Sequence, residues 1–473
     1  MNAAATGRGE TASRAGTPDP EGPKPSAGDG EALDGNALAE ALVPIVGPVT
    51  IANLSRMSGG ASRETWSFDA VAPDGTRFPL VLRRDPPGRP GEPGAMARET
   101  AAITAAAAAG LAVPEVLLVT SDPAAFGAAG MVMRRMPGET IARRILREPE
   151  LEPGRTVLVR QLAGFAAGLH ALPAPADFPA ADPLAALAGQ LSEFGQPSPV
   201  FELALAELER SRPVARQPVL VHGDFRLGNL IVGPDGLRAV LDWELTHAGD
   251  PAEDLGWLCV KAWRFGAEEP VAGLGGRAEL LAAYRAAGGA DISLAELRWW
   301  EILGTLRWGV MCVAQAEAHL SGAHRSVELA AIGRRVCEQE WDLLLLIAPA
   351  AAERAARVRP RPSGQASATP APYGRPTASE LLEAVREYLL GSVMPATSGQ
   401  VAFHARVAAN VLAIVARELE LGPAGGTGGR PPVPIAVPEA AGLADAVAAG
   451  LADAVAARLA VANPGYIGEC RHG

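Results

Sequence analysis

Lysine is almost absent from this chain of 473 residues, in which only Lys24 and Lys261 occur and arginine supplies the rest of the basic charge. A cationic site anywhere between these two residues must therefore use arginine or histidine. Basic residues are also fewer than acidic ones, which gives a formal net charge of −11. Proteins that bind nucleic acid or anionic membranes usually present a basic surface, so we expect neither as a partner.

Cysteine is scarce as well, and its four positions are far apart in the sequence: Cys259, Cys312, Cys337 and Cys470. The lack of any C-x-x-C pair argues against a zinc site, and so few cysteines in a long chain argue against a disulfide framework. The N-terminus has no basic start followed by an apolar core, and no apolar run approaches the ~20 residues of a membrane helix. We expect a cytoplasmic protein.

Low-complexity stretches divide the chain. Residues 1–35 are rich in glycine, proline and alanine without periodicity, which predicts a disordered tail. Residues 355–374 are proline-rich and predict a linker between domains, and residues 422–437 predict a loop. These boundaries leave two regions large enough to hold a core, 36–354 and 375–473.

The first hundred residues after the tail have the pattern of a small antiparallel sheet with one helix. Apolar and polar residues alternate over 65–71, and a turn signal at 73–75 separates this segment from a second apolar strand at 78–84. A helix is predicted at 95–109 from its alanine-rich composition. Two further short strands are predicted at 116–119 and 131–133.

Helices dominate the remainder. Apolar periodicity predicts helices at 155–171, 275–288, 294–320 and 324–348, then at 377–391, 398–421 and 438–461, with a strand–loop–strand at 219–243. This order predicts an α+β fold of the bilobal protein-kinase-like type, with an N-lobe at 36–135 and a C-lobe at 136–354. An all-α C-terminal domain at 375–473 follows, and we expect it to act in packing or in forming a homodimer.

The segment 221–255 holds the most informative pattern, HGDFRLGN followed by LDWE and GDPAEDL. Phosphoryl transfer needs a carboxylate that orients the acceptor hydroxyl and takes its proton, together with oxygen ligands for Mg²⁺ on the nucleotide phosphates. Asp224 suits the first role, as the catalytic base. Asn229 and Asp242, each next to a short apolar run, suit the second as metal ligands.

Neighbouring polar residues in this segment have less certain roles. Arg226 follows Asp224 by two positions and points to the same side of an extended loop, where it either neutralises the transferring phosphoryl group or fixes the loop. His222 is expected to hold the loop through a hydrogen bond. Asp250 and Asp254 open an apolar helix and are expected to be structural.

A nucleotide would need backbone groups that approach its phosphates and its base. Ser58, Gly59 and Gly60 lie between two predicted strands, where glycine permits such an approach, although a Gly-Gly pair is also typical of a plain hairpin turn. Met133 either leads into a hinge that meets the adenine or belongs to the core.

The nucleotide phosphates also require a cation on a strand. Arg83 is the candidate, with Glu99 on the following helix as its partner, because arginine keeps the charge of a lysine and adds a planar fork. Arg84 alternates to the opposite face of the strand and is the second choice.

Taken together, these motifs resemble the aminoglycoside phosphotransferase-like, or choline-kinase-like, family over roughly residues 45–350. The sequence around VLRRDPP and MRRMPGE resembles the branch of kinases found fused to acyl-CoA dehydrogenases. The resemblance to this branch implies phosphorylation of hydroxy-acyl groups. The resemblance implies ATP and Mg²⁺ as cofactors, Asp224 as base, and Asn229 and Asp242 as Mg²⁺ ligands. The wider family usually has lysine where this chain has Arg83. The C-terminal region resembles a helical domain of unknown function that accompanies such kinases.

The predicted function is phosphorylation of a small-molecule hydroxyl. Hydroxy-acyl groups, amino sugars and amino alcohols all remain open as acceptors, and a basic patch from Arg264, Arg298 and Arg307 would favour a coenzyme A ester. The alternative is a catalytically silent kinase-fold module that binds a nucleotide or a partner and acts with its helical domain.

Overall fold

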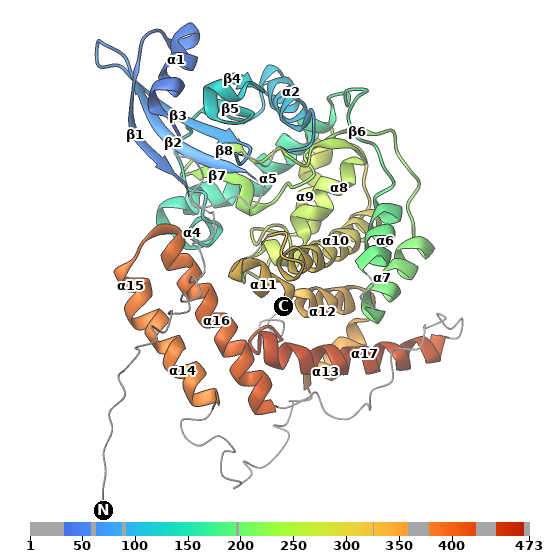
Figure 1. The fold of residues 1–473 in the computed structure, drawn as a ribbon. Helices are drawn as coiled ribbons and strands as arrows, with labels where there is room; N and C mark the ends of the chain where they lie inside the picture. The colour runs from blue at the N-terminus through green and yellow to red at the C-terminus, as the bar shows by residue number, and fades with distance from the viewer. Residues whose placement is uncertain are drawn as a thin grey trace, which may run out of the picture.

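The computed structural model describes residues 33–57, 63–87, 91–194, 198–324, 326–357, 378–421 and 441–467. A sheet-based N-lobe lies above a mainly helical C-lobe, and further helices from the C-terminal region lie beneath (Figure 1). The expected α+β bilobal class is confirmed.

The N-lobe sheet has five antiparallel strands in the order β1-β2-β3-β5-β4. The predicted hairpin is present, since β2 and β3 pair along their full length with Phe68 opposite Leu80. Alternation puts Val132 on one face and Met131 and Met133 on the other, so both faces are buried. The strands are β1 (Thr50–Arg56), β2 (Glu64–Val71), β3 (Arg77–Arg84), β4 (Val116–Thr120) and β5 (Gly130–Arg134).

Three helices accompany the sheet: α1 (Gly35–Val46), α2 (Ala95–Ala108) and α3 (Pro123–Phe126). Helix α2 is the predicted one, whereas α1 falls in a region for which no helix was predicted. Its cap, Asp34, accepts a hydrogen bond from the backbone N–H of Asn36 at 2.8 Å, and Leu33 is buried. The tail boundary expected at residue 35 is therefore wrong for residues 33–35, and residues 1–32 lie outside the described part of the chain.

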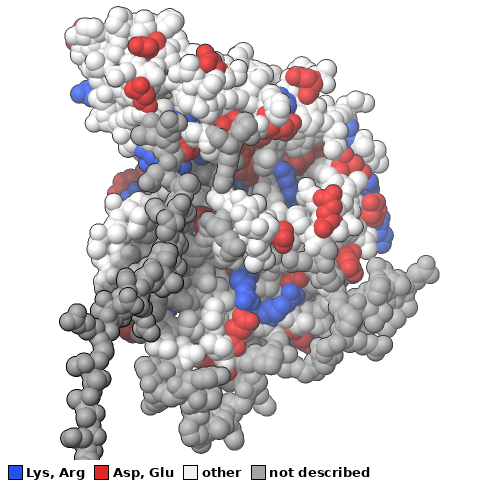
Figure 2. Space-filling view, in the orientation of Figure 1, with Lys and Arg blue, Asp and Glu red and all other residues white. Residues whose placement is uncertain are grey.

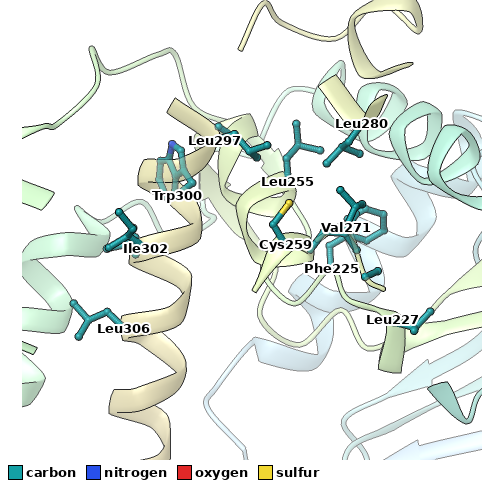
Figure 3. Packing of buried hydrophobic residues seen from close by; sticks show 14 of the residues in the cluster. Phe225, Leu227, Leu255, Cys259, Val271, Leu280, Leu297, Trp300, Ile302 and Leu306 are labelled. Carbon is teal, nitrogen blue, oxygen red and sulfur yellow. The ribbon is translucent and has the colours of Figure 1, made fainter. Parts of the chain in front are cut away.

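The C-lobe is built around the long central helix α10 (Leu294–Leu320), whose N-terminus has a capping box between Ser293 and Glu296. Figure 3 shows Leu255 and Cys259 of α8 and Leu280 of α9 near Phe225, which lies in the loop that carries Asp224. Leu227 and the apolar residues of α10 belong to the same hydrophobic cluster. The other helices are α4 (Ala142–Arg147), α5 (Glu152–His170), α6 (Pro183–Phe194), α7 (Pro199–Arg210), α8 (Pro251–Cys259), α9 (Arg277–Ala286), α11 (Val327–Gly333), α12 (Val336–Ile347) and α13 (Pro349–Arg357).

One predicted helix is wrong in extent. The segment 324–348 forms two helices, α11 and α12, because the chain turns at residues 333–335. Apolar periodicity continues across the break, so it did not reveal the turn.

Two small antiparallel pairs follow in the C-lobe, and Figure 1 shows β7 and β8 beneath the N-lobe sheet. Strands β6 (Val219–Val221) and β9 (His247–Gly249) form one pair, and β7 (Leu230–Gly233) and β8 (Gly236–Val240) form the other. The two pairs carry the predicted catalytic segment between them.

The C-terminal helices are α14 (Ala378–Tyr388), α15 (Met394–Ala396), α16 (Gly399–Leu421) and α17 (Ala441–Ala462). Helices α14 and α16 pack on each other and α16 reaches α11, whereas α17 lies against α12 and α13. Ala452, Val455 and Leu459 of α17 belong to the same hydrophobic cluster as the C-lobe core. The expectation of a separate domain at 375–473 therefore does not describe α17. Most of the predicted linker, from residue 358, lies outside the described residues.

Helix α16 is long and apolar enough, by length and composition, to cross a membrane, and Ala405 and Ala409 are its only buried residues. This corrects the expectation that no segment approaches that length. Polar contacts tie it to its neighbours: Glu418 pairs with Arg334 of the C-lobe at 2.6 Å, and Arg417 Nε donates to the carbonyl of Val461 at 2.7 Å.

Candidate active site

The loop that carries Asp224 is built on a buried carboxylate. Asp254 of α8 accepts the backbone N–H of His222 at 2.8 Å and of Gly223 at 2.9 Å. Gly223 has φ 78°, and a Cβ there would collide with the carbonyl oxygen of Leu245, so only glycine fits this turn. Asp254 is 1% exposed; burial opposes its ionisation, but hydrogen bonds from His170 and the backbone outweigh it and lower its pKa.

His222 has both ring nitrogens engaged. Its Nδ1 accepts the backbone N–H of Asp224 at 3.1 Å, and its Nε2 donates to the carbonyl of Leu241 at 3.0 Å. This pattern defines a neutral imidazole with its proton on Nε2. Complete burial lowers the pKa of His222 in the same sense. The geometry agrees with the structural role expected for this residue.

The carboxylate of Asp224 receives three side-chain donors and is 9% exposed. Trp257 Nε1 donates to Oδ1 at 2.7 Å, and Asn229 Nδ2 donates to Oδ2 at 2.6 Å. Arg226 Nε approaches both oxygens, at 2.9 and 3.1 Å. These contacts fix the plane of the Asp224 carboxylate in one orientation.

Arg226 is itself held on an aromatic face. Its guanidinium lies 4.6 Å from the ring centre of Trp263. A Cβ at Gly228 would collide with the same guanidinium, so the glycine leaves the space that Arg226 occupies. The bond to Asp224 matches the expected loop-fixing role of Arg226; contact with a phosphoryl group stays a prediction.

Asn229 and Asp242 lie at one end of the β7–β8 pair. Leu230 is opposite Val240, and the backbone N–H of Leu241 donates to the carbonyl of Asn229 at 2.8 Å, so Asp242 follows directly. Asp242 has φ 65°, a strained conformation for a residue other than glycine that is typical of functional sites.

The chemistry of this pair fits Mg²⁺. Because Asn229 commits its Nδ2 to Asp224, its amide presents the carbonyl oxygen as a ligand, and Asp242 supplies a carboxylate. Among the described residues no group of three or more His, Cys, Asp or Glu side chains is placed to hold a metal ion. Asn229 and Asp242 therefore suit an ion whose other ligands are water and phosphate oxygens.

Arg83 joins the two lobes. Its guanidinium contacts Glu99 Oε1 of α2 at 2.6 Å and Asp242 Oδ1 of the C-lobe at 2.7 Å, with Glu244 Oε2 at 3.7 Å. Burial alone would lower the pKa of Arg83, but the three carboxylates outweigh it and raise that pKa. Arg84 faces away, paired with Glu64 at 2.8 Å, so the geometry agrees with the choice of Arg83.

Two residues of this site were not anticipated. Arg63 pairs with Asp85 at 3.0 Å and also binds Glu99, so two guanidiniums share the Glu99 carboxylate. Trp257 is the other, through its bond to Asp224. Sequence offered no signal for either, because both contacts join residues more than 20 positions apart.

The remaining candidates are placed as follows. Met133 is buried in the core and is consistent with its alternative core assignment. Ser58, Gly59 and Gly60 lie outside the described residues.

The three arginines considered for a basic patch are not gathered. Arg264 binds Glu301 at 2.9 Å, Arg307 binds Glu253 at 3.1 Å, and Arg298 donates to the carbonyl of Leu346. Figure 2 shows acidic side chains spread over both lobes among the described residues of this face. A pocket of about 360 Å³ lies elsewhere, between α7, α10 and α12, and lacks all the predicted site residues.

A sheet lobe and a helical lobe, joined by a cation–carboxylate contact beside a preorganised aspartate, define a kinase-like phosphotransferase. The chain belongs to the phosphotransferase enzyme family, whose model matches residues 53–300. Residues 395–428, which include all of α16, match a domain of unknown function, DUF6285.

Similar proteins agree with this family. Acyl-CoA dehydrogenase family member 10 of Mus musculus is 31% identical over 208 residues, 38% of this chain and 18% of the mouse protein. The match thus spans less than a fifth of that relative, and it agrees with the branch that the motifs resemble.

A solved structure shows the same fold. A Ralstonia eutropha protein assigned to the aminoglycoside phosphotransferases is 20% identical, with a TM-score of 0.53 over 66% of this chain and 98% of that one. A choline/ethanolamine kinase family protein of Mesorhizobium loti is 20% identical, with a TM-score of 0.44 over 63% and 88%.

Proposed function

We propose that this chain is an ATP- and Mg²⁺-dependent kinase that phosphorylates a hydroxyl group of a small molecule. The contact between Arg83 and Asp242 carries the proposal, because it brings the N-lobe cation to the C-lobe carboxylate beside Asp224 and Asn229. A magnesium–triphosphate complex carries both complementary charges. Its phosphates can replace Asp242 as the partner of Arg83, and its metal ion can replace Arg83 as the partner of Asp242.

Each residue then has a defined task. Asp224 orients the acceptor hydroxyl and takes its proton, while Trp257 and Asn229 hold the carboxylate in place. Asn229 and Asp242 would hold Mg²⁺, which neutralises charge on the phosphates. Arg83 binds the phosphates, and Arg226 stabilises charge on the transferring group.

The aromatic surroundings favour one class of acceptor. The faces of Trp263 and Trp257 are already covered by Arg226 at 4.6 Å and Arg307 at 5.0 Å. These two rings therefore offer an ammonium group one face fewer each. A hydroxy-acyl group is the acceptor that we propose, in agreement with the branch of the mouse relative.

The test is consumption of ATP against a panel of hydroxy-acyl esters, amino sugars and amino alcohols. Asp224→Ala should lower kcat about 10²- to 10⁴-fold, the usual contribution of a positioned base. Asp242→Ala should weaken Mg-nucleotide binding more than Asp224→Ala does, by calorimetry. Asp235→Ala, in the exposed β7–β8 turn, is the matched control and should change neither.

The outcomes separate the proposal from its alternative. Turnover that survives Asp224→Ala would remove this residue as the base. Nucleotide binding without turnover of any acceptor would instead favour the silent kinase-fold module.

A further inference from the structure

The chain beyond α17 reaches the C-lobe beside the candidate active site. Tyr466 is buried, and its hydroxyl donates to Asp342 Oδ2 of α12 at 2.6 Å. The other oxygen of Asp342 pairs with Lys261 Nζ at 3.2 Å, and that ammonium lies 4.2 Å from the ring centre of Tyr466. Asp342 is 2% exposed, so its charge depends on these two partners.

The same segment makes a second contact with α12. Asn463 Nδ2 donates to Glu338 Oε1 at 3.1 Å, and Arg335 Nε binds Glu338 Oε2 at 2.9 Å. The Arg335 guanidinium lies 5.7 Å from the ring centre of Trp308. Trp308 in turn packs on Trp263, with ring centres 4.9 Å apart.

Both routes end at Trp263. Lys261 and Trp263 belong to one short 3₁₀ turn, so an anchored Lys261 fixes the backbone from which the indole projects. The indole supports the Arg226 guanidinium, which binds both oxygens of Asp224. The C-terminal segment is therefore connected to the predicted base through a few contacts of buried or half-buried groups.

The identity of residue 261 supports a specific role for this contact. It is the single lysine after residue 24 in a chain whose other basic residues are arginines. A compact ammonium can lie on the Tyr466 ring while it binds Asp342, whereas a planar guanidinium on a longer side chain needs more space.

We infer that Tyr466 and Asn463 are positioning residues, through which the C-terminal segment holds Trp263 against Arg226 and thereby orients Asp224. This inference rests on the proposed phosphotransferase function. The C-terminal segment then affects the chemical step and not nucleotide binding, since the contacts given above for Asn463 and Tyr466 go to Glu338, Asp342 and Lys261.

Tyr466→Phe tests the inference because it removes only the hydroxyl. ADP formation from Mg-ATP is measured with the best acceptor of the panel, and Mg-ATP affinity by calorimetry. We expect kcat to fall about three- to tenfold, the effect of one hydrogen bond to a charged group, with nucleotide affinity unchanged. Tyr388→Phe, at a tyrosine that is 61% exposed on α14, is the matched control and should behave as wild type.

A double-mutant cycle separates positioning from general stability. If Tyr466 acts through Arg226, Tyr466→Phe should cause no further loss of kcat in an Arg226→Ala background. An equal loss in both backgrounds, or none in the wild-type background, overturns the inference. Thermal melts of all variants identify any loss that comes from unfolding.

A spectroscopic measurement keeps the inference testable if the wild type forms no ADP, a result that would count against the proposed function alone. Tyr466→Phe should shift the indole N–H resonances of Trp263 and Trp257, whereas Tyr388→Phe should shift neither. Unchanged resonances in Tyr466→Phe would show that the C-terminal segment does not position this part of the site.

Discussion

The two halves of the candidate site are held together in different ways. The loop around Asp224 is fixed by buried hydrogen bonds that His222 Nδ1 and Asp254 accept from its backbone and that Trp257 donates to Asp224, all within 33 residues of it. The nucleotide side is fixed by ion pairs in which Arg63, Arg83 and their carboxylate partners come from both lobes. The first half is a rigid scaffold, and the second is a set of charges that can exchange partners.

This difference indicates which contacts hold the geometry of the site and which can be exchanged for a ligand. Buried hydrogen bonds to neutral and charged groups are costly to break and keep one geometry. Ion pairs at a junction between lobes can be replaced by a nucleotide and its metal, which offer the same charges. We therefore expect substitutions in the scaffold to affect folding and the chemical step, and substitutions in the ion pairs to affect binding.

The largest effect on stability should come from Asp254→Ala. It removes the acceptor of two backbone N–H groups and of His170, so we expect a loss of about 3–5 kcal/mol in the free energy of unfolding. Asp250→Ala is the control, because Asp250 caps α8 and otherwise makes one longer ion pair, with Arg216 at 3.5 Å, so its loss should cost about 1 kcal/mol. Equal losses in urea denaturation would mean that the loop does not depend on Asp254.

Arg83→Ala should have a smaller effect, confined to binding. Loss of a charge-assisted contact of about 1.5–3 kcal/mol corresponds to a ~10- to 100-fold weaker affinity for Mg-ATP. The melting temperature should fall less than in Asp254→Ala, because Arg63 still pairs with the buried Glu99 and the partners of Arg83 in the C-lobe are half-buried. Arg134→Ala, at an exposed ion pair with Glu115, should leave calorimetric affinity unchanged. If Arg83→Ala lost much stability but kept normal affinity for Mg-ATP, the ion pairs would hold the structure and would not serve binding.

The smallest effect is a pH dependence of stability. Burial lowers the pKa of His222 below the value of 6.5 of an unfolded histidine, so the unfolded state binds the proton first. The stability contributed by neutral His222 is present above pH 6.5 and is lost as pH falls toward the native pKa, by at most about 1.4 kcal/mol per pH unit. His222→Gln should flatten this part of the denaturation profile.

His247 provides the opposite case. Burial alone would lower its pKa, but the bond to Glu253 at 3.1 Å raises it, so its contribution is present below pH 6.5 and is lost as pH rises through the native pKa. His247→Gln should therefore cost stability in acid. If the free energy of unfolding changed with pH in the same way in both histidine variants, neither side chain would be responsible for the pH dependence.

How far the sequence could predict the site depends on separation along the chain. Asp224, Asn229 and Asp242 could be identified because one short segment carries them, with strands predicted on either side. Arg83 and Glu99 could be paired by matching a strand with the following helix. Arg63 and Trp257 could not, because their partners are set by how the loops and lobes come together.

The limits of the fold prediction have similar causes. The periodic pattern of 324–348 is continuous although the chain breaks into α11 and α12, and composition placed Asp34 in the tail although it caps α1. The alanine-rich pattern of α17 predicts a helix but not the surface on which it packs.

The amino-acid order alone indicated most of the strands and helices and the candidate site groups, because strand alternation, turn residues and the Asp–Asn–Asp segment act over short distances. Tertiary packing alone decided which charges face each other: two arginines on Glu99, Arg83 against Asp242, and Tyr466 against Asp342. The physical reason is that a contact between residues far apart in sequence exists only after the core has fixed both backbones, and no local pattern encodes that distance.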